Sequence, residues 1–232
     1  AVTSPDEQLS IMINEEDHLR IQVMRSGLAL GEAFAQIDDV DDRIESVTDF
    51  AYSARFGYLT ACPTNVGTGI RVSVMLHLPA LKLTGELEKV RRAAKAMSLA
   101  GRGFYGEGSD AVGDFFQISN QTTLGRSEQD LLRDFEQNVI PKVVEYERLE
   151  RRNLLEKRRL FLEDNIFRAL GTLQNARLLK TDEAMQLLSF VRLGVFLGVI
   201  DSVDAGLVSQ LTPLVQPAHL QKSSQQKLQA EE

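Results

Sequence analysis

The chain has few of the residues that several kinds of site require. It has one cysteine, three histidines and no tryptophan among 232 residues, which excludes an internal disulfide and leaves no Cys/His pattern for a zinc site. No apolar run approaches the roughly 18 residues that cross a bilayer, and no signal peptide is visible, so we expect a cytoplasmic protein that binds no membrane. With 33 acidic against 26 basic side chains, a general nucleic-acid binder is disfavoured.

Glycine, in contrast, is concentrated in one region, since nine of the 16 glycines lie between Gly57 and Gly113. The segment 62–71 reads Cys-Pro-Thr-Asn-Val-Gly-Thr-Gly-Ile-Arg and holds the single cysteine. Its glycines allow positive φ and close approach to a ligand, and its Arg71 supplies a planar charge suited to phosphate. We interpret the segment as part of a site. The alternative is a glycine-rich connector around a buried cysteine, because the spacing does not match a GxxxxGK[ST] phosphate loop.

A polar stretch interrupts the first extended region of the chain. Apolar and polar residues alternate over 9–24, which predicts strand structure with one buried face. The sequence Asn-Glu-Glu-Asp at 14–17 favours a turn or bulge, so it would place carboxylates at the rim of a sheet. A solvated turn without function is the alternative. His18 on its own is interpreted as a structural hydrogen-bonding residue.

Apolar periodicity predicts a helix and several strands over residues 30 to 78 and 116 to 119. Steps of three, four and seven indicate an amphipathic helix over 30–51. Short or alternating apolar patterns predict strands over 58–62, 70–78 and 116–119. A second glycine-rich loop, 101–108, carries one Arg and one Glu.

Helix starts are predicted from capping residues. Thr84 is expected to cap a helix whose apolar face follows it. Ser127 with Asp130 resembles a capping box that opens a long helix, and Pro141 is expected to kink that helix. Thr181 is the predicted cap of a further helix, with acidic residues in its first turn.

The composition changes near residue 148, where a charged helical run begins and glycine-rich loops end. We therefore divide the chain into a main part, 1–148, a helical module, 149–220, and a polar tail, 221–232. The helical module suggests docking or formation of a homodimer. None of its residues suggests catalysis.

Three segments together resemble a known family. Asn-Glu-Glu-Asp-His-Leu-Arg at 14–20, the segment 62–71, and Arg-Gly-Phe-Tyr-Gly-Glu at 102–107 are similar to the ATP:guanido phosphotransferases, which include the creatine and arginine kinases. Segments 74–81 and 116–121 make the chain most similar to the bacterial protein-arginine kinases. The resemblance implies an α+β fold, with an antiparallel sheet flanked by helices followed by the α-helical C-terminal module, and an ATP site without a phosphate loop.

The resemblance also implies roles for individual residues. Glu16, Cys62 and Glu107 would face the acceptor guanidinium as catalytic residues, and Asp17 would orient them. The arginines would bind phosphate, and Mg²⁺ would bridge the phosphates without a protein metal site. The implied nucleotide-binding residues are Arg20, Arg71, Val72, Ser73, Val74, Met75, Arg102, Gly103, Phe104, Tyr105, Gly106 and Glu107.

The function that the resemblance implies is phosphorylation of arginine side chains in proteins, with ATP as donor, in bacterial stress response. The implied partners are substrate proteins that present arginine, an activator protein and protease–chaperone machinery. One alternative is a kinase for small guanidines, although Tyr105 stands where such kinases usually have Arg. The other is a non-catalytic subunit that binds arginine or phosphoarginine.

Two family elements have no counterpart in this sequence. The family's N-terminal Ser-x-Arg-x-Arg element is absent, so we expect the chain by itself to bind ATP poorly. An Arg-Asp-x-x-Arg-Ala motif, which binds phosphoarginine in protein-arginine kinases, is absent too. We therefore expect no activation by phosphoarginine through a C-terminal pocket.

Overall fold

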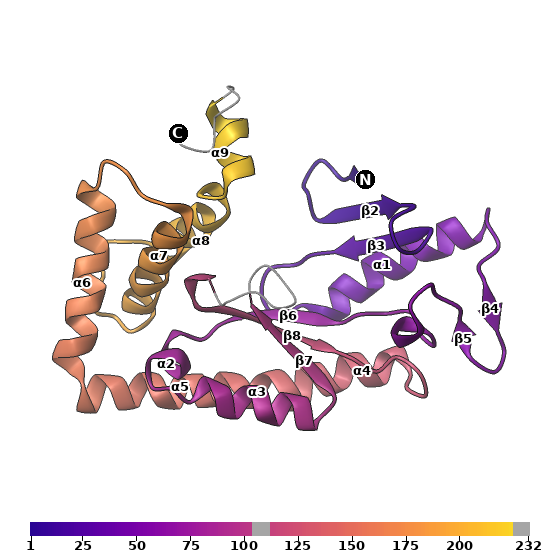
Figure 1. Ribbon diagram of the computed structural model, residues 1–232, viewed down its shortest axis with the longest axis horizontal. Coiled ribbons are helices and arrows are strands. Elements are labelled where there is room, and N and C mark those ends of the chain that lie inside the picture. Colours follow the sequence, from indigo (N-terminus) through magenta and orange to yellow (C-terminus); the bar gives the residue numbers. More distant parts are fainter. Residues whose placement is uncertain (104–111, 225–232) are drawn as a thin grey trace. The chain divides into compact units, whose positions relative to one another are not determined.

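The computed structural model describes residues 1–103 and 112–224, with the backbone alone for residues 96, 102 and 103 (Figure 1). Two compact units are formed from alternating segments of the chain. The first comprises Ala1–Val74, Ala93–Gly101 and Ile118–Val143, and the second comprises Met75–Arg92, Arg102–Gln117 and Val144–Glu232. Within the described ranges, no helix has both the length and the apolar character needed to cross a membrane.

The first unit begins with an antiparallel sheet of order β1-β2-β3. Its strands are β1 (Val2–Thr3), β2 (Leu9–Ile13) and β3 (Leu19–Val23). Leu9 pairs with Val23 and Ile13 with Leu19, so the alternating stretch predicted over 9–24 is a hairpin whose turn is the polar segment 14–18. Helix α1 (Leu30–Glu45) packs against β3. The predicted helix over 30–51 is thus confirmed, but it ends at Glu45 and not at residue 51.

The first unit also contains the cysteine-containing segment. Strands β4 (Tyr52–Ser53) and β5 (Gly57–Tyr58) form a short hairpin, and a 3₁₀ turn η1 covers Pro63–Asn65. The predicted strand over 58–62 is wrong beyond Tyr58, because Tyr58 pairs with Gly67 and the chain turns between them. The buried apolar residues of this unit include Val72, Leu99, Ile118, Leu131, Phe135 and Val139.

A third sheet has the order β6-β8-β7. Its strands are β6 (Ser73–His77), β7 (Leu99–Gly103) and β8 (Phe115–Asn120). The strands predicted over 70–78 and 116–119 are thus confirmed in their central residues. Strand β7 was not expected, because its two glycines suggested a loop, whereas pairing with β8 makes the segment extended.

Two predicted N-caps, Thr84 and Ser127, can be compared with the helices α2 to α4. Thr84 is the C-cap of α2 (Pro79–Leu83) and not the N-cap of α3 (Leu87–Ala96). Ser127 caps α4 (Glu128–Asp134), as predicted, by accepting a hydrogen bond from the Asp130 N–H at 3.1 Å. A π-helical turn, η3 (Phe135–Val139), separates α4 from α5 (Ile140–Lys157) just before Pro141.

The second unit is mainly helical. After the 3₁₀ turn η2 (Val112–Asp114) and most of α5, it contains α6 (Arg159–Asn175), α7 (Thr181–Phe196), α8 (Ala205–Leu214) and α9 (Pro217–Ser224). Lys180, and not Thr181, is the N-cap of α7. Helices α6 and α7 lie side by side (Figure 1). A Cβ at Gly194 would come within 2.6 Å of the Ile166 Cγ2 atom, so glycine permits this close approach.

One core joins these helices to α2. Ala80 of α2 is fully buried in the same apolar cluster as residues of α5 to α8. The other buried members are Leu154, Leu162, Ile166, Ala169, Leu188, Val191, Leu193, Ile200 and Val208.

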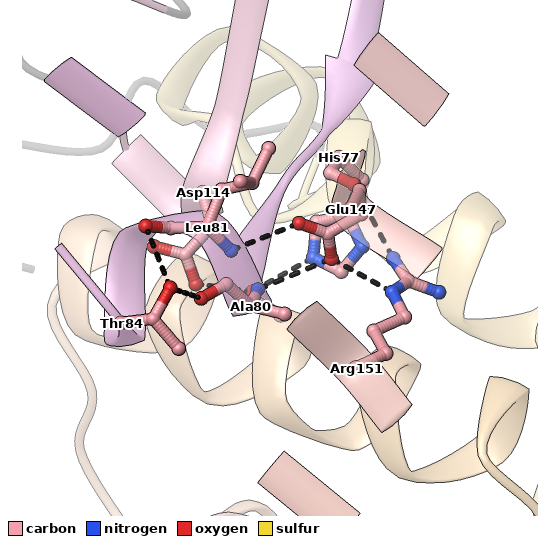
Figure 2. A network of polar contacts seen from close by, with 8 residues as sticks. His77, Ala80, Leu81, Thr84, Asp114, Glu147 and Arg151 are labelled. Atoms are coloured by element: carbon pink, nitrogen blue, oxygen red, sulfur yellow. Dashed lines mark hydrogen bonds and ion pairs between the residues drawn. The ribbon is translucent and has the colours of Figure 1, made fainter. Parts of the chain in front are cut away.

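Glu147 caps α2 from α5 (Figure 2). The Glu147 carboxylate accepts hydrogen bonds from the backbone N–H groups of Ala80, at 3.1 Å, and Leu81, at 3.0 Å. It also pairs with Arg151 Nε at 2.7 Å, and the Arg151 guanidinium reaches the His77 carbonyl at 3.3 Å. An acidic side chain at a helix N-terminus satisfies free N–H groups and is favoured by the helix dipole.

A second buried network surrounds Asp114, which adopts positive φ at 59°. Its carboxylate accepts hydrogen bonds from Lys82 Nζ at 2.5 Å, Gln186 Nε2 at 2.8 Å and Ser189 Oγ at 2.5 Å. Because Ser189 gives its proton to Asp114, the 2.8 Å contact between Ser189 Oγ and His77 Nε2 requires the histidine to donate. The network ties η2, β6 and α2 to α7.

Candidate active site

The turn between β2 and β3 carries the first group of predicted site residues. Arg20 forms ion pairs with Glu15 at 2.8 Å and with Glu16 at 3.1 Å. The turn itself is closed by a hydrogen bond from the Asn14 N–H to the His18 carbonyl at 3.0 Å. These side chains are partly exposed, and exposed ion pairs contribute little to stability. Arg20 and Glu16 can therefore exchange this contact for contacts with a charged ligand at little cost.

Asp17 connects this turn to the cysteine-containing segment. Its Oδ1 atom accepts a hydrogen bond of 2.7 Å from the Ala61 N–H. The neighbouring Cys62 is partly exposed, and its Sγ shares a 2.9 Å hydrogen bond with Thr64 Oγ1. The structure thus brings Glu16 and Cys62, both predicted to face the acceptor, onto two turns that are hydrogen-bonded to each other. The connector interpretation required a buried cysteine, but Cys62 is partly exposed.

Glycine at position 67 fixes the course of the segment that follows. Gly67 has a φ of 118°, and a Cβ there would lie 2.6 Å from the Thr123 carbonyl oxygen. Two backbone hydrogen bonds join Gly67 and Tyr58, at 2.8 and 3.2 Å. No other residue type fits both the backbone angle and the contact. The loop is therefore built to a definite shape between Cys62 and Arg71.

Carboxylates of α1 act on Tyr58, which is hydrogen-bonded to this loop. Burial, and then the carboxylates of Glu45 and Asp41, raise the pKa of the Tyr58 phenol. Burial, and then Asp38 and Asp41, likewise raise the pKa of Glu128.

Arg71 lies two residues before the start of β6 and is exposed, while the next residue, Val72, is buried. The side chain of Arg71 makes no hydrogen bond or ion pair with the described residues. The predicted nucleotide-binding stretch continues along β6 with partly buried Ser73 and Val74 and exposed Met75. An exposed guanidinium at the start of a strand can contact a phosphate in two places at once.

The second glycine-rich segment contributes less to the described structure. Arg102 and Gly103 lie at the end of β7, where only the backbone is described. The predicted residues Phe104, Tyr105, Gly106 and Glu107 lie outside the described residues. Among those that are described, no group of three or more His, Cys, Asp or Glu side chains is arranged to hold a metal ion.

Two residues that the sequence analysis did not single out for a role support the site. Asn120, at the end of β8, accepts a hydrogen bond from the Val72 N–H at 2.8 Å. Thr123 donates to the carbonyls of Thr64 and Val66, at 3.0 and 2.7 Å. Polar residues directly after a predicted strand were a weak signal, because most such residues are solvated.

Comparisons with known proteins show which family the chain resembles. The family described as ATP:guanido phosphotransferase, C-terminal catalytic domain, matches residues 1–150. The family described as protein-arginine kinase McsB C-terminal domain matches residues 159–232. Protein-arginine kinases of Caldanaerobacter subterraneus subsp. tengcongensis and Halalkalibacterium halodurans are each 48% identical, over 96% and 94% of this chain. The chain spans 65% and 61% of those two relatives.

Solved structures of guanidine kinases resemble the chain as well. A lombricine kinase matches with a TM-score of 0.56 and 31% identity, covering 62% of this chain and 40% of that one. The duplicated taurocyamine kinase of Schistosoma mansoni matches in fold, with a TM-score of 0.55 and 24% identity over 71% of this chain and 24% of its own. Given the catalytic-domain match over residues 1–150, the chain belongs to the ATP:guanido phosphotransferase family.

Proposed function

We propose that the protein transfers the γ-phosphoryl group of ATP to the guanidinium of arginine side chains in proteins. The observation that carries this proposal is the hydrogen bond between Asp17 and Ala61, because it joins the turn of Glu16, which is ion-paired to Arg20 of β3, to the segment of Cys62. An acid, a thiol and an arginine at one place suit a cationic acceptor and an anionic donor. The match of residues 159–232 to the C-terminal domain of protein-arginine kinases favours a protein acceptor.

The proposed reaction forms an N–P bond and breaks the bond between the γ-phosphorus and the ADP oxygen. Its transition state is loose, so catalysis depends on positioning and on neutralising phosphate charge. In our proposal, Arg20, Arg71 and Arg102 bind the phosphates of ATP. ATP enters as its magnesium complex, and the ion offsets charge on the phosphates.

Glu16 orients the attacking nitrogen and accepts its proton. A guanidinium and an ordinary carboxylic acid differ in pKa by roughly 8 units, so the proton cannot leave before the N–P bond begins to form. Transfer to Glu16 therefore accompanies bond formation. Cys62 adds negative charge beside the guanidinium when it is a thiolate, and Glu107 holds the other edge of the planar group by charge-assisted hydrogen bonds.

The wider assignments are proposals of the same kind. We propose a catalytic part over 1–148, a helical module over 149–220 that forms a homodimer, and a polar tail over 221–232. We also propose that the enzyme acts in the cytoplasm during stress, with an activator protein and protease–chaperone machinery as partners. The family match supports these assignments by analogy alone.

The test is a transfer assay with the complete gene product, magnesium and ATP labelled at the γ-phosphate. The acceptors are an arginine-rich protein, the same protein with every arginine replaced by lysine, free arginine and free creatine. We expect acid-labile label on the arginine-rich protein and none on the lysine version. Comparable label on free creatine would make the protein a kinase of small guanidines, and no label on any acceptor would leave the binding subunit as the better interpretation.

A further inference from the structure

Asn120 and Thr123 are buried polar residues at one end of β8. Asn120 is 3% exposed and Thr123 is 5% exposed. Burial of a polar side chain is unfavourable unless its hydrogen bonds are made. Both residues make hydrogen bonds to the backbone of the segment that runs from Thr64 to Val72, and Asn120 Nδ2 also donates to the Thr122 carbonyl at 3.3 Å.

Asn120 holds the two peptide groups on either side of Arg71. Its Oδ1 accepts the Val72 N–H at 2.8 Å, and its Nδ2 donates to the Ile70 carbonyl at 3.1 Å. The Asn120 N–H also donates to the Val72 carbonyl, at 3.3 Å. One side-chain amide thus fixes the backbone of Arg71 while the guanidinium remains exposed. The direction in which Arg71 leaves the backbone is set by Asn120.

Thr123 holds the other end of the same segment. Its hydroxyl lies 3.0 Å from the Thr64 carbonyl and 2.7 Å from the Val66 carbonyl, and one O–H proton is shared between them. Thr64 in turn shares a hydrogen bond with the Cys62 thiol. The Thr123 carbonyl accepts the Thr68 N–H at 3.4 Å. Thr123 therefore holds the turn that follows Cys62, whose own carbonyl accepts from Thr60 Oγ1 at 2.7 Å and from the Asn65 N–H at 3.0 Å.

We propose that Asn120 and Thr123 are positioning residues that hold Arg71 and Cys62 in a fixed relation. Their consequence for catalysis depends on the function proposed above. Arg71 serves the phosphate side of that reaction and Cys62 the guanidinium side, and both are tied to one short stretch at the end of β8. In phosphoryl transfer a misplacement of about 1 Å can cost about 100-fold in rate, so a common anchor maintains the distance between donor and acceptor.

The first arm of the test does not need catalysis. Cys62 is the only cysteine of the 232-residue chain, so its alkylation by iodoacetamide reports the state of the loop. Thr123→Val keeps the shape of the side chain and removes the hydroxyl. Thr122→Val is the matched control, because Thr122 is exposed and only its carbonyl is used. We expect the labelling rate to change about fivefold in Thr123→Val, the equivalent of one hydrogen bond, and to stay unchanged in Thr122→Val.

The second arm is a double-mutant cycle in the complete gene product. We expect Asn120→Ala to lower kcat/KM on the arginine-rich protein by tenfold or more, mainly through kcat, at about 1.4 kcal/mol per decade. In an Arg71→Lys background the same change should cost less than about twofold, because residues that act as a unit are not additive. If Asn120→Ala fails to fold, Thr123→Val combined with Cys62→Ser gives the equivalent cycle.

The two arms separate the two proposals. Equal losses in both backgrounds, or equal labelling of Cys62 in all variants, would overturn the positioning role. A chain whose Cys62 labelling responds as expected, but whose complete gene product phosphorylates nothing, would keep the anchor and overturn the proposed function.

Discussion

Replacing Glu147 by Gln removes one of the two carboxylate oxygens that cap α2. The Oε1 atom accepts from the Ala80 N–H and from Arg151 Nε, and the Oε2 atom accepts from the Leu81 N–H. In Glu147→Gln the amide oxygen can keep the hydrogen bonds from the Ala80 N–H and Arg151 Nε. The amide NH₂ then faces the Leu81 N–H, and both of these groups are donors. Glu147 is 4% exposed, so water cannot compensate for the loss.

The free energy of unfolding should fall by about 2 to 4 kcal/mol. An unsatisfied buried N–H costs about 1 to 3 kcal/mol, and a charged hydrogen bond that becomes neutral loses about 1 kcal/mol more. For a chain of this length the change corresponds to a decrease of roughly 5 to 15 °C in Tm.

The assay is thermal unfolding of the 232-residue chain, followed by circular dichroism at 222 nm, a wavelength that reports helix. Glu145→Gln is the matched control, because Glu145 lies exposed on the same helix α5. High salt should leave the difference between the two variants nearly unchanged, since buried pairs are screened weakly. If the Tm of Glu147→Gln equals that of Glu145→Gln, the carboxylate does not cap α2 and the argument fails.

Three further predictions concern the site and its surroundings. Glu16→Gln in the complete gene product should lower kcat by at least about 100-fold, the scale of general-base catalysis, with little change in ATP affinity by calorimetry; near-normal turnover would exclude Glu16 as the base. Gly67→Ala should destabilise the chain by about 2 kcal/mol or more in urea unfolding, because it adds a clash with the Thr123 carbonyl to a strained φ. Gly125→Ala, also at positive φ but with open space around it, should cost less. Equal losses in the two variants would show that the close approach of Gly67 to Thr123 is unimportant. Burial, and then Arg151 and Arg192, hold the pKa of His77 well below its usual value, so the unfolded chain binds the proton more readily than the folded chain. Stability should therefore fall as the pH drops below about 6.5, by up to about 1.4 kcal/mol per pH unit. In His77→Gln the Tm should depend less on pH between pH 7.5 and 5, and parallel Tm curves for the two proteins would contradict this.

The hairpin and the main helices could be predicted from local pattern, whereas short elements could not. The hairpin over 9–24 was predicted from the alternation of apolar and polar residues alone. Ser127 was predicted as a helix cap from its residue type, and it caps α4 in the structure. Helix α2 was missed although Pro79 occupies a first helical position that favours proline. Its cap comes from Glu147, a residue far along the chain, so no local signal marked it. Strand β7 was missed because Gly101 and Gly103 are extended only through pairing with β8.

For the candidate site, the sequence supplied residue types and the structure supplied their relation. The family resemblance named Glu16, Arg20, Cys62 and Arg71. The described structure places Glu16 and Cys62 on two hydrogen-bonded turns, with Arg20 on the adjoining strand β3 in an ion pair with Glu16. The bond from Ala61 to Asp17 could not be predicted, because it depends on where two distant turns meet. The roles of these residues remain predictions until the transfer assay is performed.

The burial of Ala80 in the core of the helical module has a consequence for how such proteins diversify. Ala80 belongs to the segment that matches the catalytic-domain family, while most of its neighbours belong to the segment that matches the C-terminal family. The surface on which α5 to α8 pack is therefore partly made by the catalytic segment. A guanidine kinase without such helices must cover this face in another way or carry polar residues on it, so substitutions on α2 should track the presence or absence of the helical module across the family.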